Sequence, residues 1–302
     1  MGLRRKRVAN EQDDSIVRPR AGVLFLVATP IGNLADLSPR ARETLRDADW
    51  LFAEDTRHTS QLLNACGIVR PPGTTESLHE HNERVRLSRV VERLRSGERV
   101  ALVSDAGTPL VSDPGAALVQ AVAEAGIEVV AVPGPCAAIA ALCLSGLPIE
   151  RFTFEGFLPA RPAARVKTLQ ALVSEPRTLV FYEAPHRLQE SLADLVQVFG
   201  ADRRAAIARE ITKRFESTYR GTLGTLAQRA AEDPDMSRGE MVLVVHGAEP
   251  RESANDIEVD ALLRALLAEL PVSQAAKIAA KISGRPRKDL YDRALTLGAP
   301  RG

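Results

Sequence analysis

Short apolar runs alternate with helix-length segments along most of this chain, and this alternation is what most constrains its fold. The first run, VLFLVATP, follows Gly22 and is bounded by Gly and Pro, which is typical of a strand buried on both faces of a parallel sheet. Ser38 and Pro39 then supply a helix N-cap and a first-turn proline before RARETLRDA, and DWLFAE follows as a second strand. This β-α-β opening predicts a parallel sheet covered by helices.

The alternation continues through both halves of the chain. Helices are predicted over 56–66 and 83–95, and the strands RVALVS and EVVAVPG flank a helix that ends at Gly126. After Pro148 come the strands FTFEGF, TLVFYE, RRAAIARE and GEMVLVVHG, with helical stretches over 162–173 and 186–199. Because ESTYRGTL lacks helical spacing, it predicts an antiparallel element and a mixed second sheet.

These patterns predict a fold class of two α/β domains, the first with a parallel sheet and the second with a mixed one, and a small helical C-terminal appendage. The expected organisation is a disordered basic tail at 1–20, an N-terminal domain at 21–146, a C-terminal domain at 147–248, and a linker with a helical tail at 249–302.

Composition excludes several classes of protein. With 302 residues, 45% hydrophobic and 26% charged, the chain is long enough for two globular domains and unlike a disordered or collagenous sequence. Its three cysteines lack CxxC spacing, which disfavours a disulfide framework or a structural zinc site. No run approaches the ~18 apolar residues of a membrane span, so we predict a cytoplasmic protein with no membrane partner. The net charge of +1 means that RNA binding would require a local basic patch.

The most informative segment is SDAGTPLVSDPG, which runs from Ser104 to Gly115 at the carboxyl end of a predicted buried strand. Ligands of α/β sheets bind outside the carboxyl ends of strands, and glycines there let backbone amides approach a ligand. A ligand-binding loop is favoured; the alternative is an ordinary turn in which Asp113 caps a helix that starts at Pro114. The junctions ATPIGNL, PGPCAA and FYEAPHR are of the same kind, so several strand ends should converge on one cleft.

Several common motifs are absent from the sequence. No GxGxxG follows the first strand and no GxxxxGK[ST] occurs, so NAD and ATP lose their main support. Nor are there HExxH, GxSxG or paired Cys/His ligands, so no metal site is predicted and Ser-triad chemistry is disfavoured.

Taken together, the segments VATPIGNLADLSPRA, FAEDTRHT, SDAGTPLVSDPG, VPGPCAA, FYEAPHR, ARE and GEMVLVV resemble the tetrapyrrole methylase superfamily. More narrowly, the chain resembles the ribosomal RNA small subunit methyltransferase I branch, in unbroken order from about Val23 onward. The resemblance implies S-adenosylmethionine-dependent 2'-O-methylation of a cytidine in the decoding region of 16S rRNA. It also implies a cofactor held between the two domains, and a homodimer.

The resemblance also carries over a set of cofactor-binding positions from several strand ends. These are Pro30, Asp105, Ala106, Gly107, Thr108, Val111, Cys136, Ala137, Tyr182, Glu183, Ala208 and Met241. Where many tetrapyrrole methylases have an acidic residue in a GDP core, this chain has Gly107-Thr108-Pro109, which argues against a porphyrin substrate. Backbone groups would hold the methionine end of the cofactor while apolar walls enclose the adenine.

A ribose hydroxyl is a poor nucleophile, so a positioned base or charge would assist methyl transfer. The candidate catalytic side chains follow two strands and the ARE segment: Glu54, Asp55, Arg57, His58, Glu183, His186 and Lys213. The alternative for the first group is structural, with Asp55 or Thr56 capping a helix and Arg57 pairing with an acid. His186 is equally consistent with a first-turn residue after Pro185, and Lys213 and Arg187 with solvated surface charges.

Basic side chains in the tail and one in the second domain are candidate RNA contacts. They are Arg187, Lys277, Lys281, Arg285, Arg287 and Lys288, most of them near a turn between two short predicted helices. A solvated helical pair is the alternative, and Tyr291 is the only aromatic residue of the tail, so extensive base stacking is not expected there.

The hypothesis is therefore a methyltransferase acting on 16S rRNA within the small ribosomal subunit. An assembled subunit is the expected substrate, because sequence-specific reading of RNA needs nucleotides splayed out by a folded context. Two alternatives stay open: a methylase acting on a tetrapyrrole carbon, and a non-catalytic ribosome-assembly factor that binds RNA.

Overall fold

The computed structural model describes residues 22–79, 82–249 and 252–298. The basic tail predicted at 1–20 lies outside the described residues. The described residues up to Gly247 form one compact unit, and those from Ala248 form a second.

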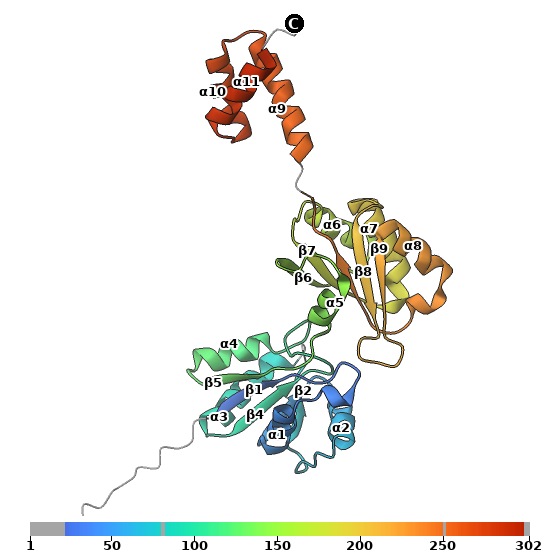
Figure 1. The fold of residues 1–302 in the computed structure, drawn as a ribbon. Helices are drawn as coiled ribbons and strands as arrows, with labels where there is room; N and C mark the ends of the chain where they lie inside the picture. The colour runs from blue at the N-terminus through green and yellow to red at the C-terminus, as the bar shows by residue number, and fades with distance from the viewer. Residues whose placement is uncertain (1–21, 80–81, 250–251, 299–302) are drawn as a thin grey trace, which may run out of the picture. The chain divides into compact units, whose positions relative to one another are not determined.

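The first unit begins with a five-stranded parallel sheet in the order β3-β2-β4-β1-β5 (Figure 1). Its strands are β1 (Val23–Val27), β2 (Trp50–Ala53), β3 (Thr75–Ser77), β4 (Arg99–Val103) and β5 (Glu128–Val132), and its helices are α1 (Pro39–Asp47), α2 (Thr56–Ala65), α3 (Glu83–Arg95) and α4 (Ala116–Glu124). The predicted parallel, helix-covered sheet is confirmed. The short edge strand β3 was not predicted, because TES contains no apolar residue.

Helices cover both faces of this parallel sheet, as the unbroken apolar runs require. On one face, α1 and α2 pack against Val27, Ala101 and Val103. On the other, α3 and α4 pack against neighbours that point the opposite way, including Val100 and Leu102. The alternation along β4 therefore buries both sides of one strand.

The second sheet is mixed, as predicted, with the order β6-β7-β10-β8-β9. Here β6 runs parallel to β7, and the other neighbouring pairs are antiparallel. The strands are β6 (Phe152–Phe157), β7 (Thr178–Glu183), β8 (Arg204–Arg209), β9 (Ser217–Thr222) and β10 (Met241–Val245), and the helices are α5 (Ala137–Ser145), α6 (Pro162–Leu172), α7 (Leu188–Phe199) and α8 (Leu223–Glu232).

The two faces of the mixed sheet are covered unequally. On one face α5 packs Ala141 and Leu142 against Val180 and Val242. On the other, α6, α7 and α8 enclose a larger core around Phe181. Sequence reasoning did not predict α5, because the segment AAIAALCLS is apolar all round and has no amphipathic period.

Local capping explains where the helices of the site begin. Ser38 Oγ accepts the Ala41 N–H at 3.0 Å before α1, and Asp55 caps α2 by accepting the Arg57 N–H at 2.8 Å. The alternative in which Asp113 caps a helix starting at Pro114 is wrong: α4 begins at Ala116, and its N-cap is Gly115 with φ of 121°. A Cβ on Gly115 would lie 2.7 Å from Leu102 Cδ2, so a side chain is excluded there. Three short 3-10 turns complete the unit: η1 (Leu34–Asp36), η2 (Pro185–Arg187) and η3 (Pro234–Ser237).

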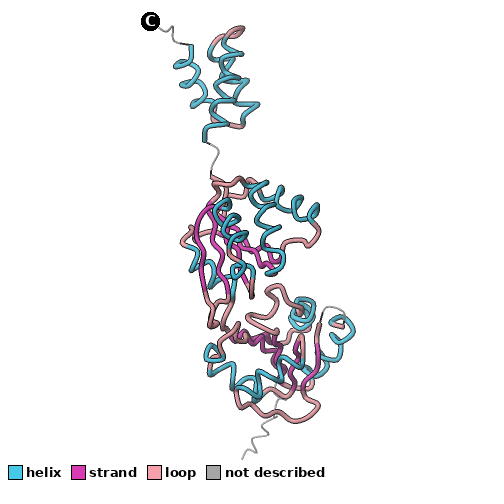
Figure 2. The backbone as a smooth tube through the Cα atoms, turned by 90° about the vertical axis from the view of Figure 1, so that its right-hand side faces the viewer, coloured by secondary structure: helices cyan, strands magenta, loops and turns pink. Residues whose placement is uncertain are grey.

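The second unit contains α9 (Glu252–Leu267), α10 (Val272–Ser283) and α11 (Arg287–Gly298), which the tube in Figure 2 shows as a helical cluster. Its small core includes Leu263, Ala279, Leu290 and Ala294. Gly284 ends α10 in the left-handed conformation, φ of 68°, in agreement with the predicted helical appendage.

None of the helices in the described part of the chain is both long and apolar enough to span a membrane.

Candidate functional site

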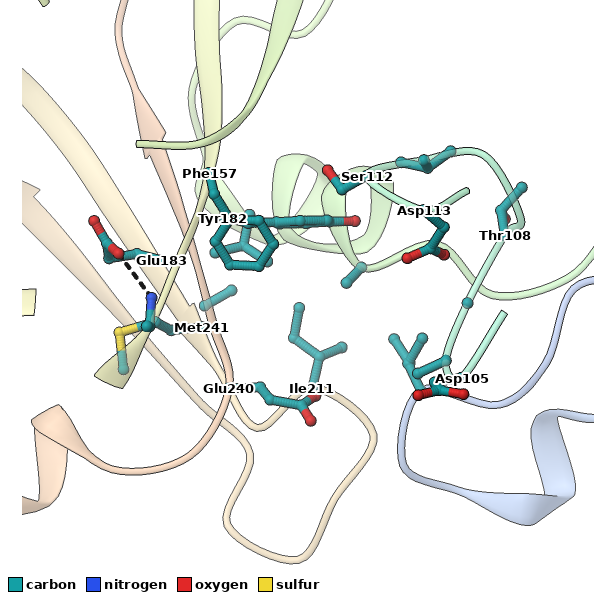
Figure 3. Close-up of a pocket in the computed structure, with 18 of the residues that line it drawn as sticks. Asp105, Thr108, Ser112, Asp113, Phe157, Tyr182, Glu183, Ile211, Glu240 and Met241 are labelled. Carbon is teal, nitrogen blue, oxygen red and sulfur yellow. Dashed lines mark hydrogen bonds between the residues drawn. The ribbon is translucent and has the colours of Figure 1, made fainter. Parts of the chain in front are cut away.

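A cavity of about 470 Å³ lies inside the first unit, where ends of strands from both sheets meet. Its volume is within the range of pockets that take small molecules or cofactors. One wall comes from the first sheet, from Glu54 after β2 and from the loop after β4. The other comes from β6, β7, β8 and β10 of the second sheet (Figure 3). The strand ends thus converge on one cleft.

The loop after β4 forms much of the first wall. It contributes Asp105, Ala106, Gly107, Thr108 and Val111, all of which the sequence singled out. The backbones of Gly107 and Thr29 exchange two hydrogen bonds, of 2.9 and 3.1 Å, and Thr108 Oγ1 donates to the Pro135 carbonyl at 3.0 Å. These contacts tie the ends of β1, β4 and β5 together beside the cavity.

The same loop contains two non-glycine residues in the left-handed region, Leu110 with φ of 75° and Ser112 with φ of 66°. Such residues persist only where their surroundings fix them, and they cluster at ligand sites. Ser112 lines the cavity, and its Oγ would lie 3.4 Å from a Cβ on Gly156. Gly156 sits at a register shift in β6, so the loop touches the second sheet there.

Three carboxyl groups line the first wall: Glu54, Asp105 and Asp113. Burial, with the nearby negative charges of Asp113 and Asp105, raises the pKa of Glu54. Burial also raises the pKa of Asp113, although a hydrogen bond from Ser104 opposes the shift. Figure 3 shows Asp105 and Asp113 on the same side of the cavity. The first wall is therefore acidic, and two of its carboxyls, Glu54 and Asp113, are partly withdrawn from solvent.

The second wall is mostly apolar. Three of the predicted cofactor-binding residues, Tyr182, Ala208 and Met241, line it beside Phe157 and Ile211. The Phe157 and Tyr182 rings meet edge to face with centroids 5.4 Å apart. Burial raises the pKa of Tyr182 to about 12, so its hydroxyl stays neutral at physiological pH.

Glu183 lies at the edge of this wall with its carboxylate fully engaged. Its Oε1 accepts the Ala184 N–H at 2.8 Å and Arg187 Nε–H at 2.7 Å, and its Oε2 accepts the Ser191 hydroxyl. Arg187 also donates to the Leu158 carbonyl at 2.8 Å. Glu183, a candidate catalytic residue, and Arg187, a candidate RNA contact, therefore form an ion pair at the turn after β7.

Of the polar residues in the AEDTRHT segment, some face the cavity and others face solvent. Glu54 lines the cavity, whereas Arg57 points to solvent with 85% of its side chain exposed and pairs with Asp55 at 2.7 Å. Hydrogen bonds from the Arg57 side chain and backbone hold the pKa of Asp55 well below its usual range. The structural interpretation of Asp55 and Arg57, a cap and an ion pair, is confirmed.

His58 is connected to the cavity through Asp105. Its Nδ1 lies 3.1 Å from Asp105 Oδ2, and this contact raises the pKa of His58. His186, by contrast, lies exposed in η2.

Lys213 belongs to the loop between β8 and β9. Its Nζ contacts Glu210 at 2.9 Å and Glu240 at 3.1 Å, and Glu240 lines the cavity. Burial disfavours its charge, but the hydrogen bonds to Glu210 and Glu240 outweigh burial and raise the pKa of Lys213. The Lys213 stem fills the space in which a Gly32 side chain would lie, so it joins the loops after β1 and β8.

Two predicted cofactor contacts, Pro30 and Cys136, are not in the cavity lining. Pro30 precedes Ile31, which does line it, and Cys136 packs beside Tyr182. The sequence reasoning missed nine lining residues: Ile31, Ser112, Asp113, Phe157, Ala184, Pro185, Ile211, Glu240 and Val242. Ser112, Asp113 and Glu240 lie inside recognised motifs, whereas Phe157 and Ile211 reach the cavity only through tertiary packing.

The basic cluster of the second unit surrounds the turn between α10 and α11. Lys277, Lys281, Arg287 and Lys288 are exposed, and Arg285 between the helices is partly buried. As far as the structure describes the chain, those four exposed residues make no ion pair, whereas Arg293 pairs with Asp260 at 2.8 Å. Within the same residues, no group of three or more His, Cys, Asp or Glu is arranged to hold a metal ion.

Comparison with known proteins gives a family for both units. Residues 23–227 match the family model of tetrapyrrole (corrin/porphyrin) methylases, and residues 253–298 match that of the RsmI C-terminal HTH domain. Solved structures share the fold at low identity. One is a diphthine synthase with TM-score 0.54 and 18% identity, covering 75% of this chain and 90% of that one. Another is the methyltransferase CobJ with TM-score 0.52 and 20% identity, covering 78% and 98%.

Curated relatives match along almost their whole length. The ribosomal RNA small subunit methyltransferase I of Xylella fastidiosa strain Temecula1 is 55% identical over 89% of this chain and 98% of its own. The protein of that name from Pseudomonas aeruginosa is 53% identical over 91% and 97%, and that from Escherichia coli O157:H7 is 49% identical over 91% and 95%. The chain therefore belongs to the tetrapyrrole methylases and, among them, to the family of ribosomal RNA small subunit methyltransferase I.

Proposed function

We propose that the protein transfers a methyl group from S-adenosylmethionine to the ribose 2'-oxygen of a cytidine in the decoding region of 16S rRNA. The observation that carries the proposal is the cavity between the two sheets, lined by the strained glycine loop and three carboxyls, in a chain of this family. The names of the curated relatives support ribosomal RNA of the small subunit as the substrate.

The cavity fits such a cofactor in size and in chemistry. Its apolar wall, with Tyr182 and Met241, suits an adenine ring, and the open backbone around Gly107 lets amide groups reach a polar end. S-adenosylmethionine has a positive sulfonium, which the acidic wall complements. When bound, the cofactor would supply an electrophilic methyl group and leave as a neutral thioether.

We assign cofactor binding to residues that line the cavity on its two walls: Asp105, Ala106, Gly107, Thr108, Val111, Ala137, Tyr182, Ala208 and Met241. Pro30 and Cys136 would act indirectly, by holding Ile31 and Tyr182 in place.

The ribose hydroxyl must lose a proton as its oxygen forms the new bond. Glu54 and Asp113 are suited to accept it, because both line the cavity and their raised pKa values bring them closer to neutral pH. Asp105 contacts the exposed His58, so these two side chains would offer the proton a path from the cavity to solvent. We assign positioning roles to Lys213, Glu183 and Arg187, which are engaged in ion pairs that shape the site.

The second unit would hold the RNA outside the cavity. Its four exposed cations, unpaired in the described part of the chain, suit contacts with phosphates. The family model that matches this unit is named for a helix-turn-helix domain, which supports a nucleic-acid role. A homodimer, an assembled small subunit as the substrate and a cytoplasmic location complete the proposal, on the strength of the family alone.

Methyl transfer to defined acceptors tests the proposal. Labelled S-adenosylmethionine is incubated with small subunits lacking the modification, with free 16S rRNA and with a uroporphyrinogen, and labelled nucleosides are identified by mass spectrometry. Label in 2'-O-methylcytidine is expected. Label only in the tetrapyrrole would contradict the proposal in favour of carbon methylation, and cofactor binding without any transfer would favour a non-catalytic RNA-binding factor.

A further inference from the structure

One exposed aromatic side chain follows the cavity-lining Ile211 in the chain without lining the cavity itself. Phe215 lies in the loop that joins β8 to β9 and is 62% exposed. The guanidinium of Arg214, the preceding residue, lies over its ring, with Cζ 5.6 Å from the ring centroid. One face of the ring is therefore covered by a cation, and the side chain as a whole is accessible to a flat partner.

The loop holds Phe215 in a defined position. Arg209 Nη1 donates to the Phe215 carbonyl at 3.0 Å, and the Thr212 N–H donates to Glu216 Oε2 at 2.7 Å. Two residues of the loop, Glu210 and Thr212, have φ of 51° and 68°, a backbone that only such contacts maintain. The ring is therefore presented to solvent on an ordered loop.

The loop also borders the cavity. Ile211, four positions before Phe215, lines it, and Lys213 packs against Gly32 of the opposite half. Figure 1 shows the loop extending beyond the ends of β8 and β9. A molecule whose reacting atom enters the cavity would therefore have neighbouring parts within reach of this loop.

We propose that Phe215 and Arg214 form a stacking platform for an unpaired base of the RNA substrate, an inference that rests on the proposed function. A ribose in a folded RNA becomes accessible when its nucleotide leaves the stack, and proteins replace the lost stacking with aromatic rings or arginine planes. Phe215 offers the ring, and Arg214 offers a plane and a positive charge for the adjacent phosphate.

The surroundings of Phe215 favour a base over a protein partner. Its exposed neighbours in the chain, Arg214 and Glu216, are charged, whereas the centre of a protein interface is depleted of charge and spans ~800 Å² on each side. In the described residues, the Arg214 guanidinium makes no ion pair with an acidic side chain, so its charge is available. One ring with a cation above it suits a single planar base.

Single-turnover methyl transfer to small subunits tests the platform. In Phe215→Ala, the subunit concentration for half-maximal rate should rise by roughly tenfold, the scale of one lost stacking contact, with the limiting rate and cofactor affinity unchanged. Phe215→Trp should restore it, and Arg214→Gln should give a smaller rise. Val69→Ala removes a side chain that is 86% exposed away from the cavity lining and should change nothing.

Fluorescence separates this inference from the proposed reaction. The tryptophan of Phe215→Trp should be quenched by a 16S rRNA fragment containing the decoding region, and that of Val69→Trp should not. Quenching without methyl transfer would support the platform and contradict the reaction. Transfer with wild-type half-saturation in Phe215→Ala would overturn the platform alone, as would a changed sedimentation coefficient of that variant, which would assign the ring to a contact between copies.

Discussion

The two walls of the cavity are built from the same kind of α/β layer, yet they differ in chemistry. The parallel sheet presents loops, so its wall combines small and polar loop residues with three carboxyls. The mixed sheet presents the inner face and ends of its strands, so its wall consists of Tyr182, Ala208, Met241 and other mostly apolar groups. The difference follows from topology, because every strand of a parallel sheet ends at the same edge and its connections gather there.

This contrast gives the walls separate tasks. The acidic wall is suited to charge and to proton transfer, and the apolar wall to the flat surface of a ligand. Substitutions on either wall test whether the two tasks are separate.

The largest effect is expected from Gly107→Asp, because it places a side chain where φ is 90° and a Cβ would lie 3.3 Å from Ile31 Cγ2. Affinity for S-adenosylmethionine, measured by calorimetry, should fall by roughly 100-fold or more. Gly126→Asp is the matched control, since Gly126 has φ of 69° with open space around it. If the two variants bound S-adenosylmethionine with equal affinity, the glycine loop would not be part of the cofactor site.

Arg187→Ala is expected to act on the fold rather than on charge recognition. It leaves the buried Glu183 carboxylate without its cation, and such a loss destabilises a protein by about 3 kcal/mol. Urea denaturation measures the free energy of unfolding, and Arg187→Lys should recover part of it. If the variant kept wild-type stability and lost only affinity for RNA, Arg187 would be an RNA contact, as the sequence first indicated.

Removing the charges of the acidic wall tests whether this wall stabilises the positive charge of the cofactor. Two unit charges ~8 Å apart interact by about 2 kcal/mol at an effective dielectric constant of about 20, before screening. The double variant Glu54→Gln/Asp113→Asn should therefore weaken S-adenosylmethionine binding by roughly tenfold. Binding of S-adenosylhomocysteine, whose thioether is neutral, should change much less.

Glu240→Gln provides the control for that double variant. Glu240 also lines the cavity, but it is paired with Lys213 and 75% exposed. In Glu240→Gln, the ratio of the affinity for S-adenosylmethionine to that for S-adenosylhomocysteine should keep its wild-type value. If this ratio is also unchanged in the double variant, Glu54 and Asp113 do not interact with the positive charge of the sulfonium.

The smallest effect is a pH dependence. Because their pKa values are raised in the folded protein, Glu54 and Asp113 keep protons to a higher pH than in the unfolded chain. In this interval the folded state binds more protons, so stability without ligand falls as pH rises, whereas affinity for a cation rises as the carboxyls ionise. Lowering the pH from neutral toward the range in which these two carboxyls take up protons should therefore weaken S-adenosylmethionine binding relative to the thioether, by less than the double substitution does.

The same titration in Glu54→Gln/Asp113→Asn assigns the effect. His58 also titrates near this range, beside Asp105, and it remains in the double variant. A pH dependence that survives the double substitution would belong to His58 and not to the acidic wall.

The sequence predicted the layers of the fold well, because a strand buried on both faces must be apolar throughout. It did not predict α5, whose uniformly apolar sequence has no helical period, or β3, whose three residues lack apolar side chains. In both cases tertiary contacts, and not a local pattern, determine the structure.

The residues of the candidate site likewise include some that a local motif indicates and others that only tertiary packing brings to the cavity. The sequence indicated Gly107 and its loop because glycines cluster there at the end of a strand, but Phe157 enters the cavity from a strand without a motif, and nothing in the ARE segment indicated the role of Ile211. A capping role for Asp113 stayed open as the alternative, because nothing local in the sequence distinguishes a capping carboxylate from one that lines a cavity. Arg187 resembled a surface charge because the burial of Glu183 arises only when β7 packs against α7.

Hydrogen exchange of the amide groups with and without S-adenosylmethionine tests whether the cofactor is held between the two unlike walls. We expect slower exchange in both Ser104–Gly115 and the strands that contain Tyr182 and Met241, with no change in α10 and α11. Slower exchange in one wall only, or in neither, would contradict this expectation.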